Sequence, residues 1–286
     1  MRLCRFAPDR LGLVEDGRVW DVTGALDILP LRRWAFPAGD PVIAQLPAIL
    51  AAARALLPRA ACHDIADVQL LSPVATPSKI VAAPVNYQLH LDEANADHEI
   101  TLGVQAAPID KAGLFLKANS ALAGPSEPIR ITFPDRRTDH EAEVAVVIGM
   151  RARDVPASQA LAHVAGYCLA LDMTVRGSED RSFRKSCDGY AVLGPWLTMA
   201  DEVGDPGDIA FSLTINGAPR QASTTARLIR GIPELIAWAS RFYTLHPGDV
   251  LMTGTPEGVG PVAPGDVLRI ESDVLGTMTT NIFREV

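Results

Sequence analysis

The chain contains little cysteine. Only four cysteines occur among its 286 residues, and no two of them form a CxxC pair; they are Cys4, Cys62, Cys168 and Cys187. A chain of this length does not depend on a disulfide framework, and zinc-ribbon sites need closely spaced cysteine pairs. We therefore expect four reduced, buried thiols, without disulfides and without a zinc site.

Long apolar runs and an excess of basic charge are also missing. No uncharged apolar stretch reaches the roughly 18 residues that a membrane helix needs, and the N-terminal sequence MRLCRFAPDR lacks the apolar run of a signal peptide. Lysine and arginine number 26 against 34 aspartates and glutamates, which gives a net charge of −8. Nucleic-acid and anionic-membrane surfaces need a basic stripe. The sequence therefore predicts a cytoplasmic protein that binds neither nucleic acid nor membrane.

The first 75 residues are predicted to form a small N-terminal α+β accessory domain. Leu11–Val14 and Val19–Val22 flank an Asp16-Gly17 pair, which is typical of a tight β-hairpin turn. Residues 41–57 carry apolar side chains at helical spacing. Prolines at positions 73 and 77 then favour an extended connection. We place a domain boundary there, with the accessory domain at 1–75 and the main domain at 76–286.

Residues 76–286 are predicted to be mainly β with a few helices. Runs rich in valine and isoleucine occur at 79–85, 143–148 and 209–215, and an Asn216-Gly217 turn signal follows the last of them. Helical patterns cover residues 157–165 and 232–242, with Pro233 at the start of the second. The sequence Pro-Gly-Asp-Val-Leu occurs at 247–251 and again at 264–268, and it predicts two strands that begin after the same kind of turn.

Three carboxylates are candidate metal ligands. Glu141 and Glu143 lead into the apolar run Val144–Ile148, and alternate residues of a strand point to the same face. Asp172 ends the next apolar run. Each acid alone is compatible with a solvated strand start or a turn. Three acids without a nearby histidine or cysteine set suit a hard cation such as Mg²⁺ or Mn²⁺.

His90 and Glu93 form a second candidate group. They are three residues apart, which makes them neighbours on one helical turn. A carboxylate beside an imidazole fixes the tautomer of the ring and raises its basicity, as a water-activating base requires. From these residues alone, a solvated helix start in an acidic loop is the alternative.

Lys185 and a glycine-rich segment are the remaining candidates. Lys185 follows Arg184, and its ammonium could stabilise a developing oxyanion or belong to a basic surface patch. Residues 253–260, TGTPEGVG, lack the lysine and hydroxyl residue that end a P-loop. Their glycines let backbone N–H groups approach an anion, and a loop without a ligand is the alternative.

Seven segments between residues 79 and 282 occur in a characteristic order. They are KIVAAPVNYQLHLDE, FLKANSALAGP, DHEAEVAVVIG, VAGYCLALDMTVR, RKSCDGYAVLGPW, the QASTT segment at 221–225, and LMTGTPEGVGP. Each segment alone is weakly specific, whereas seven in colinear order are a strong signal. Together they resemble the fumarylacetoacetate hydrolase family. The resemblance implies a mixed β-sandwich roll and a homodimer.

The resemblance also assigns roles to individual residues. It implies that Glu141, Glu143 and Asp172 bind the metal, that His90 and Glu93 form a dyad on a mobile lid, and that Lys185 is the active-site lysine. Substrate contacts are expected from Tyr87, Lys117, Arg176, Arg184, Gly254 and Thr255. The chain departs from the family pattern between Arg176 and Lys185, where a common glutamine has no counterpart, and at Arg184, where glycine is frequent.

Family substrates are 2,4-diketo acids or related acylpyruvates, so the resemblance implies a Mg²⁺- or Mn²⁺-dependent hydrolase of a C–C bond in small-acid or aromatic catabolism. The metal would hold the carboxylate and 2-oxo group of the substrate, His90 would deprotonate a water, and Lys185 would stabilise the oxyanion. The same enolate chemistry supports an oxaloacetate-type decarboxylase or a 2-hydroxymuconate-type isomerase. The altered 176–185 segment also leaves open a catalytically silent member that binds a metal or ligand.

Arg184 bears on the choice of substrate. An arginine that faces the pocket would pair with a second carboxylate and favour dicarboxylic substrates such as fumarylpyruvate or maleylpyruvate. The alternative is that the arginines of this segment, Arg181 among them, point to solvent and offset the excess acid of the chain.

Overall fold

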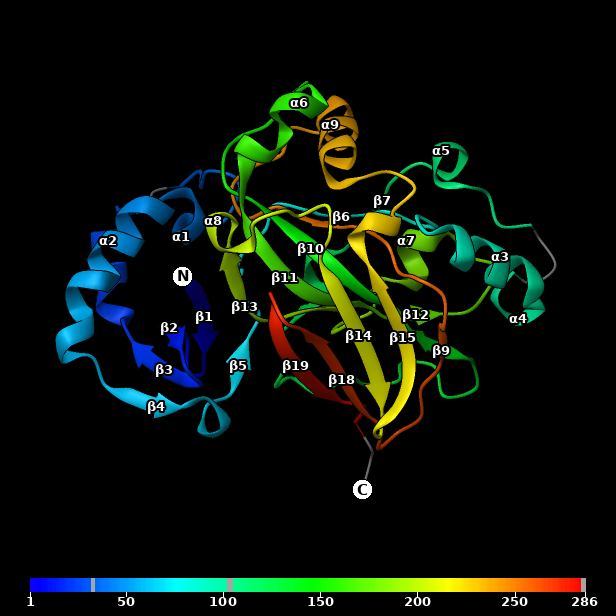
Figure 1. The fold of residues 1–286 in the computed structure, drawn as a ribbon, viewed down its shortest axis with the longest axis horizontal. Helices are drawn as coiled ribbons and strands as arrows, with labels where there is room; N and C mark the ends of the chain where they lie inside the picture. The colour runs from blue at the N-terminus through cyan, green and yellow to red at the C-terminus, as the bar shows by residue number, and fades with distance from the viewer. Residues whose placement is uncertain (32–33, 102–104, 284–286) are drawn as a thin grey trace.

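The computed structural model describes residues 1–31, 34–101 and 105–283, and Figure 1 shows three β-sheets with helices around them. Ten strands of the largest sheet lie in the order β4 (Cys62–Asp64), β3 (Arg18–Asp21), β2 (Arg10–Glu15), β1 (Arg2–Phe6), β13 (Ala191–Met199), β11 (Val164–Asp172), β10 (Ala142–Ile148), β16 (Val250–Met252), β6 (Ile80–Ala82) and β7 (Phe115–Lys117). Two short strands complete its twelve: β5 (Leu70–Leu71) beside β1 and β8 (Leu122–Ala123) beside β13.

The other two sheets are small. One has four strands in the order β15 (Ala218–Thr224), β14 (Ala210–Ile215), β18 (Val267–Ser272) and β19 (Gly276–Asn281). The other has three strands in the order β12 (Thr174–Val175), β9 (Thr138–His140) and β17 (Gly260–Pro261). Parallel pairs, such as β16 with β6, occur beside antiparallel ones in the large sheet. The predicted mainly β fold with a mixed sheet is therefore confirmed.

Both predicted hairpins form, and their turns lie at the predicted residue pairs. Asp16 and Gly17 both have positive φ, 47° and 73°, between β2 and β3. Asn216 and Gly217, with φ of 52° and 81°, connect β14 to β15 in the same way. Both Pro-Gly-Asp-Val-Leu segments lead into strands, β16 and β18.

The helices are short, and the structure divides one predicted helix into two. They are α1 (Pro41–Ala44), α2 (Leu46–Leu56), α3 (Gln88–Ala96), α4 (His98–Thr101), α5 (Ile109–Ala112), α6 (Ala157–Ala160), α7 (Arg181–Arg184), α8 (Ala200–Val203) and α9 (Ile232–Phe242). The predicted 41–57 helix breaks at Gln45, because Pro47 lacks an N–H to continue the hydrogen-bond ladder. The predicted 157–165 helix is also shorter, because the chain leaves it through a 3₁₀ turn and Val164 begins β11.

The large sheet is covered on both faces, and β10 shows this most clearly. All seven of its residues are buried. Val144, Val146 and Ile148 pack in one apolar cluster with residues of β14, β18 and α9, whereas Ala145 and Val147 pack in another with residues of β1 and α2. Because alternate residues of a strand point to opposite faces, the sheet is a middle layer between the small four-stranded sheet and the N-terminal helices.

The N-terminal segment is joined to the rest of the chain through this sheet. Strand β1 pairs with β13, with Leu3 opposite Leu197. Figure 1 shows the N-terminal strands and α2 at one side of the molecule and helices α3 and α4 at the other. The segment has the expected mixture of strands and helices, and the division at residue 75 into folding units stays a prediction.

The four thiols are all free, but only two of them are buried. Cys4 and Cys168 are buried, and burial raises the pKa of each to about 12. Cys62 and Cys187 are partly exposed, so the expectation of burial is wrong for these two. Among the helices of the described residues, none has the length and apolar character required to cross a membrane.

Candidate active site

The pairing of β10 with β11 brings the three predicted acids together. Ala142 lies opposite Leu171, so Glu141 and Asp172 are the next residues on each side, and the N–H of Asp172 donates to the carbonyl of Glu141 over 2.8 Å. Glu143 is two residues from Glu141 on the same face. All three side chains are buried, and one carboxylate oxygen from each lies within 4.8 Å of the others. Two distant sequence segments therefore form one cluster of hard oxygen ligands.

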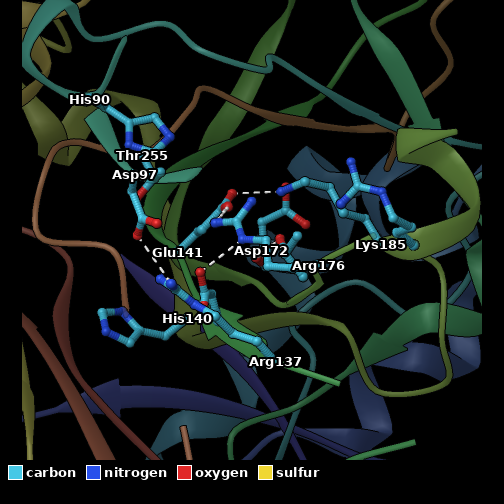
Figure 2. Close-up of polar contacts among 12 residues, drawn as sticks. His90, Asp97, Arg137, His140, Glu141, Asp172, Arg176, Lys185 and Thr255 are labelled. Atoms are coloured by element: carbon cyan, nitrogen blue, oxygen red, sulfur yellow. Dashed lines mark hydrogen bonds and ion pairs between the residues drawn. The ribbon is translucent and has the colours of Figure 1, made fainter. Parts of the chain in front are cut away.

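Three cationic side chains surround this acid cluster. Lys185 Nζ donates to Glu141 Oε2 over 2.5 Å and to Asp172 Oδ2 over 2.8 Å. Lys117, at the end of β7, forms a buried ion pair with the other oxygen of Asp172. Arg176 Nη2 donates to Glu141 Oε1 over 3.0 Å. Figure 2 shows Glu141, Asp172, Arg176 and Lys185 converging in the centre of the site.

The pKa values of Glu141 and Glu143 are shifted in opposite directions. Burial raises the pKa of Glu141, but the Lys185 ammonium and the Arg176 guanidinium outweigh burial and hold that pKa well below its usual value. Burial also raises the pKa of Glu143, and the charge of Asp172 raises it further. Among the described residues, Glu143 accepts one hydrogen bond, from the Gly254 N–H over 2.7 Å. Glu143 is therefore the acid whose charge the described residues compensate least.

The glycine-rich segment does bring backbone N–H groups to anions, and those anions are the protein's own carboxylates. The N–H of Gly254 binds Glu143, and the N–H of Gly258 binds Glu93 over 2.9 Å. Gly254 has a φ of 102°, and a Cβ there would lie 2.8 Å from the Cβ of Asn86. Glycine is therefore required at residue 254 by both conformation and space.

His90 and Glu93 lie on α3, and they form the expected pair. His90 Nδ1 lies 3.2 Å from Glu93 Oε2. Burial raises the pKa of Glu93, but hydrogen bonds from His90 and from the Gly258 N–H lower it more. Glu93 is therefore ionised and accepts a hydrogen bond from the Nδ1–H of His90, which leaves Nε2 of the imidazole as the acceptor.

A cavity of about 450 Å³ joins the dyad to the acid cluster. Its wall includes His90, Glu141, Arg176, Arg181, Arg184, Lys185 and Thr255. The Thr255 hydroxyl donates to the Ala142 carbonyl over 2.8 Å and accepts from the Gln221 amide. Four of these side chains, those of Arg176, Arg181, Arg184 and Lys185, are cationic, which suits a small anionic substrate.

Three of the predicted substrate contacts lie behind this wall. Gly254 holds Glu143, and Lys117 is buried against Asp172. Tyr87 is buried, its hydroxyl has no hydrogen-bond partner among the described residues, and burial followed by the charge of Glu143 raises its pKa. Direct contact of these three residues with a substrate stays a prediction.

The structure adds two positioning residues that the sequence reasoning missed. Gln221 accepts from the Ala142 N–H over 3.0 Å and donates to Thr255, so it fixes the strand next to the acids. Asp139 accepts from Arg176 over 2.8 Å and from Arg137 over 2.7 Å. Both lie in segments that carried the family resemblance, QASTT and DHEAE, but only the spatial contacts reveal their partners.

Comparison with known proteins identifies the family. A profile described as fumarylacetoacetate (FAA) hydrolase C-terminal matches residues 79–283. The chain belongs to the fumarylacetoacetate hydrolase family. The match includes every residue of the acid cluster and of the dyad, so the family resemblance inferred from the sequence is confirmed.

Relatives within the family carry several activities. A maleylpyruvate hydrolase from Aquipseudomonas alcaligenes is 53% identical over 284 residues and matches 99% of each chain. A mitochondrial oxaloacetate tautomerase from Xenopus laevis is 33% identical over 99% of this chain and 90% of its own.

Solved structures of the family have the same fold. The crystal structure of a maleylpyruvate hydrolase from Sphingobium sp. SYK-6 matches with a TM-score of 0.83, at 38% identity and over 100% of both chains. A second structure of that enzyme is a complex with manganese(II) ion and pyruvate. A 5-carboxymethyl-2-hydroxymuconate delta-isomerase from Mycobacterium smegmatis matches with a TM-score of 0.73, at 30% identity and over 100% of both chains.

Proposed function

We propose that this protein is a Mg²⁺- or Mn²⁺-dependent hydrolase that cleaves a C–C bond of an acylpyruvate, with maleylpyruvate as the representative substrate. The observation that carries the proposal is one cavity lined both by Glu141 of the three-carboxylate cluster and by His90 of the His–Glu dyad. The 53% identity to a maleylpyruvate hydrolase over nearly the full length supports the substrate class. Hydrolysis adds one water and releases pyruvate together with a second carboxylic acid, which is maleate for maleylpyruvate.

The donor set fits a hard divalent cation. Glu141, Glu143 and Asp172 supply only oxygen ligands, close together and buried, which is the set that Mg²⁺ and Mn²⁺ prefer. A cation there would also compensate the charge of Glu143. When bound, the metal supplies a Lewis acid and a template for the 2-oxo acid group of the substrate. The manganese complex of the Sphingobium enzyme supports this assignment.

His90 is the proposed general base. Glu93 accepts the hydrogen bond from Nδ1–H, so Nε2 is free to accept a proton from a water in the cavity. The fixed tautomer and the partial burial of Glu93 keep the imidazole oriented before the substrate arrives. The deprotonated water attacks the carbonyl distal to the pyruvate unit.

Lys185 is the proposed oxyanion stabiliser. An ammonium carries three protons, and two of those on Lys185 are committed to Glu141 and Asp172. The third remains for the oxygen that becomes negative when the water attacks. Arg176 and Thr255 line the same cavity and are proposed to contact the substrate.

A specific observation also favours a second activity, namely oxaloacetate tautomerisation. Oxaloacetate tautomerases from Xenopus laevis and Bos taurus match 99% of this chain at 33–34% identity. Keto–enol exchange needs a base and a metal-bound 2-oxo acid, and it needs no attacking water. The dyad and the higher identity to a hydrolase favour C–C hydrolysis.

We also infer that the protein forms a homodimer. A groove of about 1320 Å³ lies beside the active-site wall and shares Arg184 with it. Phe133 and Phe183 line the groove and are exposed, Phe183 with 65% of its surface accessible. Large exposed aromatic groups gathered at one groove are typical of interaction surfaces. Light scattering after size exclusion should give twice the chain mass, and a monomeric mass at micromolar concentration would contradict the inference.

The function is tested by identifying products. The protein, supplied with Mn²⁺, is incubated with maleylpyruvate, acetylpyruvate and oxaloacetate, and the products are followed by proton NMR. We expect pyruvate and maleate from the first acid and pyruvate and acetate from the second. Tautomerisation of oxaloacetate without hydrolysis of either acylpyruvate would replace the hydrolase proposal with the second activity.

A further inference from the structure

Three arginines line the active-site cavity, and two of them are already engaged. Arg176 donates to Asp139 and to Glu141. Arg184 donates from Nε to the Glu179 carbonyl and from Nη1 to the Val175 carbonyl, both over 2.9 Å. Two of the five donors of each guanidinium therefore bind the protein's own oxygens, which fixes both groups in place.

Arg181 differs from both. It lines the same cavity at the start of α7 and is half-buried. Within residues 1–31, 34–101 and 105–283 its guanidinium has no hydrogen-bond or ion-pair partner, and it lies over the Phe115 ring, 6.0 Å from Cζ to the centroid. A guanidinium has five donors, so Arg181 can bind an anion in the cavity.

Glu179 is the cavity-lining acid nearest to Arg181 in the sequence, and its carboxylate is bound by another arginine. Both carboxylate oxygens of Glu179 accept from Arg136, over 3.0 and 2.8 Å. Asp180 accepts from the Ser182 N–H at the start of α7. Neither carboxylate therefore forms an ion pair with Arg181 in place of a ligand.

The position of Arg181 relative to the acid cluster suits a short ligand with two charged ends. Lys185 Nζ lies 5.6 Å from the Phe115 centroid and Arg181 Cζ lies 6.0 Å from it, so the two cationic ends are at most about 12 Å apart. Lys185 touches Glu141 and Asp172 directly. A ligand whose one end lies at the acid cluster can therefore reach Arg181 with its other end.

We propose that Arg181 binds the distal carboxylate of a dicarboxylic acylpyruvate and so determines the preference for diacids. This inference rests on the proposed function, because it takes the pyruvate end of the substrate to lie at the acid cluster. The sequence directed attention to Arg184 for this role. Because main-chain carbonyls hold Nε and Nη1 of Arg184, whereas the Arg181 guanidinium has no partner among the described residues, the structure assigns the distal carboxylate to Arg181. A planar fork matches a carboxylate with two parallel hydrogen bonds.

The test compares two substrates in one variant. In Arg181→Ala, kcat/KM for maleylpyruvate should fall about 10- to 100-fold, mainly through KM, as expected for the loss of a charge-assisted pair. The value for acetylpyruvate, which has a methyl group in place of the distal acid, should stay within about twofold. Arg181→Lys keeps the charge without the fork, and its value for maleylpyruvate should lie between those of Arg181→Ala and the wild type.

Arg151→Ala is the matched control, because Arg151 is exposed at the opposite end of β10 and the variant removes the same charge. It should hydrolyse both acids like the wild type. Equal losses on both acids in Arg181→Ala, or no loss on either, would overturn the proposal. So would a loss confined to maleylpyruvate that Arg151→Ala reproduces, since that loss would reflect net charge alone.

Maleate binding separates this proposal from the proposed function. If the wild type hydrolyses neither acid, the function proposal fails, and calorimetry with maleate and the Mn²⁺-supplied protein still tests Arg181. Arg181→Ala should weaken maleate binding about 10- to 100-fold, and unchanged affinity would overturn the role of Arg181. Melting temperatures of wild type and variant, compared without ligand, show whether the variant is folded.

Discussion

Arg137 and Asp139 are joined by a 2.7 Å hydrogen bond that links the segment carrying the dyad to the acid cluster. On one side, Arg137 also donates to Asp97, which caps the end of α3, and to Glu99 on α4. On the other side, Asp139 accepts from Arg176, which in turn binds Glu141. Figure 2 shows Arg137 between Asp97 and the residues of the cluster. An unbroken series of ion pairs thus runs from α3 and α4 to a proposed metal ligand.

Arg137→Ala should loosen α3 and α4 without removing any proposed catalytic group. Because three ion pairs are lost together, kcat/KM should fall about 3- to 30-fold, mostly through KM, while metal affinity changes little. Amide hydrogen exchange in residues 88–101 should become faster, and exchange in α9 should not. Arg153→Ala, which breaks an exposed ion pair with Asp154, is the control. Unchanged exchange in 88–101 would show that Arg137 does not restrain these helices.

Glu143→Gln should weaken metal binding without destabilising the fold. Burial and Asp172 raise the pKa of Glu143, so an isosteric neutral amide should leave the melting temperature of the metal-free protein equal or higher. Mn²⁺ affinity should fall by at least about tenfold. Loss of a residue that only supports a metal ligand often weakens metal binding by that factor, and Glu143 is itself a proposed ligand. Calorimetric titration with Mn²⁺ measures it, with Glu127→Gln outside the cavity as the control. Full Mn²⁺ affinity in Glu143→Gln would remove Glu143 from the ligand set.

The His90–Glu93 pair predicts both a rate effect and a pH effect. His90→Ala should lower kcat for maleylpyruvate by about 10²–10⁴-fold, the usual loss for a general base, with Mn²⁺ binding intact. The pKa of Glu93 is lowered in the folded state, so the stability that its charge contributes is present above the unfolded pKa of about 4.3 and is lost as the pH falls. The wild type should therefore lose its advantage in melting temperature over Glu93→Gln between about pH 5 and pH 3. A difference that stays constant over this range would contradict the pairing.

Asp40 should matter for stability although it is far from the chemistry. Its buried carboxylate accepts from the N–H groups of Val42 and Ile43 at the start of α1, and from those of Ala75 and Thr76 in the expected connection between the two segments. Asp40→Ala leaves these donors unsatisfied and should cost about 2–4 kcal/mol of unfolding free energy. Asp27→Ala, at an exposed position whose side chain has no hydrogen-bond or ion-pair partner among the described residues, should cost less than about 0.5 kcal/mol. Urea unfolding measures both, and equal values for the two variants would contradict the role of Asp40.

Features that depend on neighbouring residues were predictable from the sequence. The Asp16-Gly17 turn and α9 follow from local preferences, since a positive φ and an N-terminal proline act within a few residues. The face shared by Glu141 and Glu143 follows from the two-residue period of a strand. Long-range pairing was not predictable. The insertion of β1 beside β13 and the burial of Lys117 against Asp172 depend on strand register across more than 50 residues, which local pattern does not encode.

The partners of charged residues were the least predictable part of the site. Asp139, Arg176 and Arg181 look alike in the sequence as ionisable residues near the motifs. Only the structure shows that Asp139 bridges two arginines while Arg181 faces the cavity without a partner among the described residues. Charge compensation is a property of three-dimensional proximity, because the interaction of two charges depends on their separation and burial.

Metal removal followed by add-back, with both products quantified, is the sharpest test of metal-dependent C–C hydrolysis by this protein. The protein is stripped with a chelator, supplied with maleylpyruvate, and then given Mn²⁺ or Mg²⁺ while pyruvate and maleate are quantified. We expect no turnover in the stripped protein, recovery on addition of either metal, and equal amounts of pyruvate and maleate after recovery. Full turnover in the stripped protein, or consumption of maleylpyruvate without equimolar pyruvate and maleate after the metal is restored, would contradict metal-dependent C–C hydrolysis.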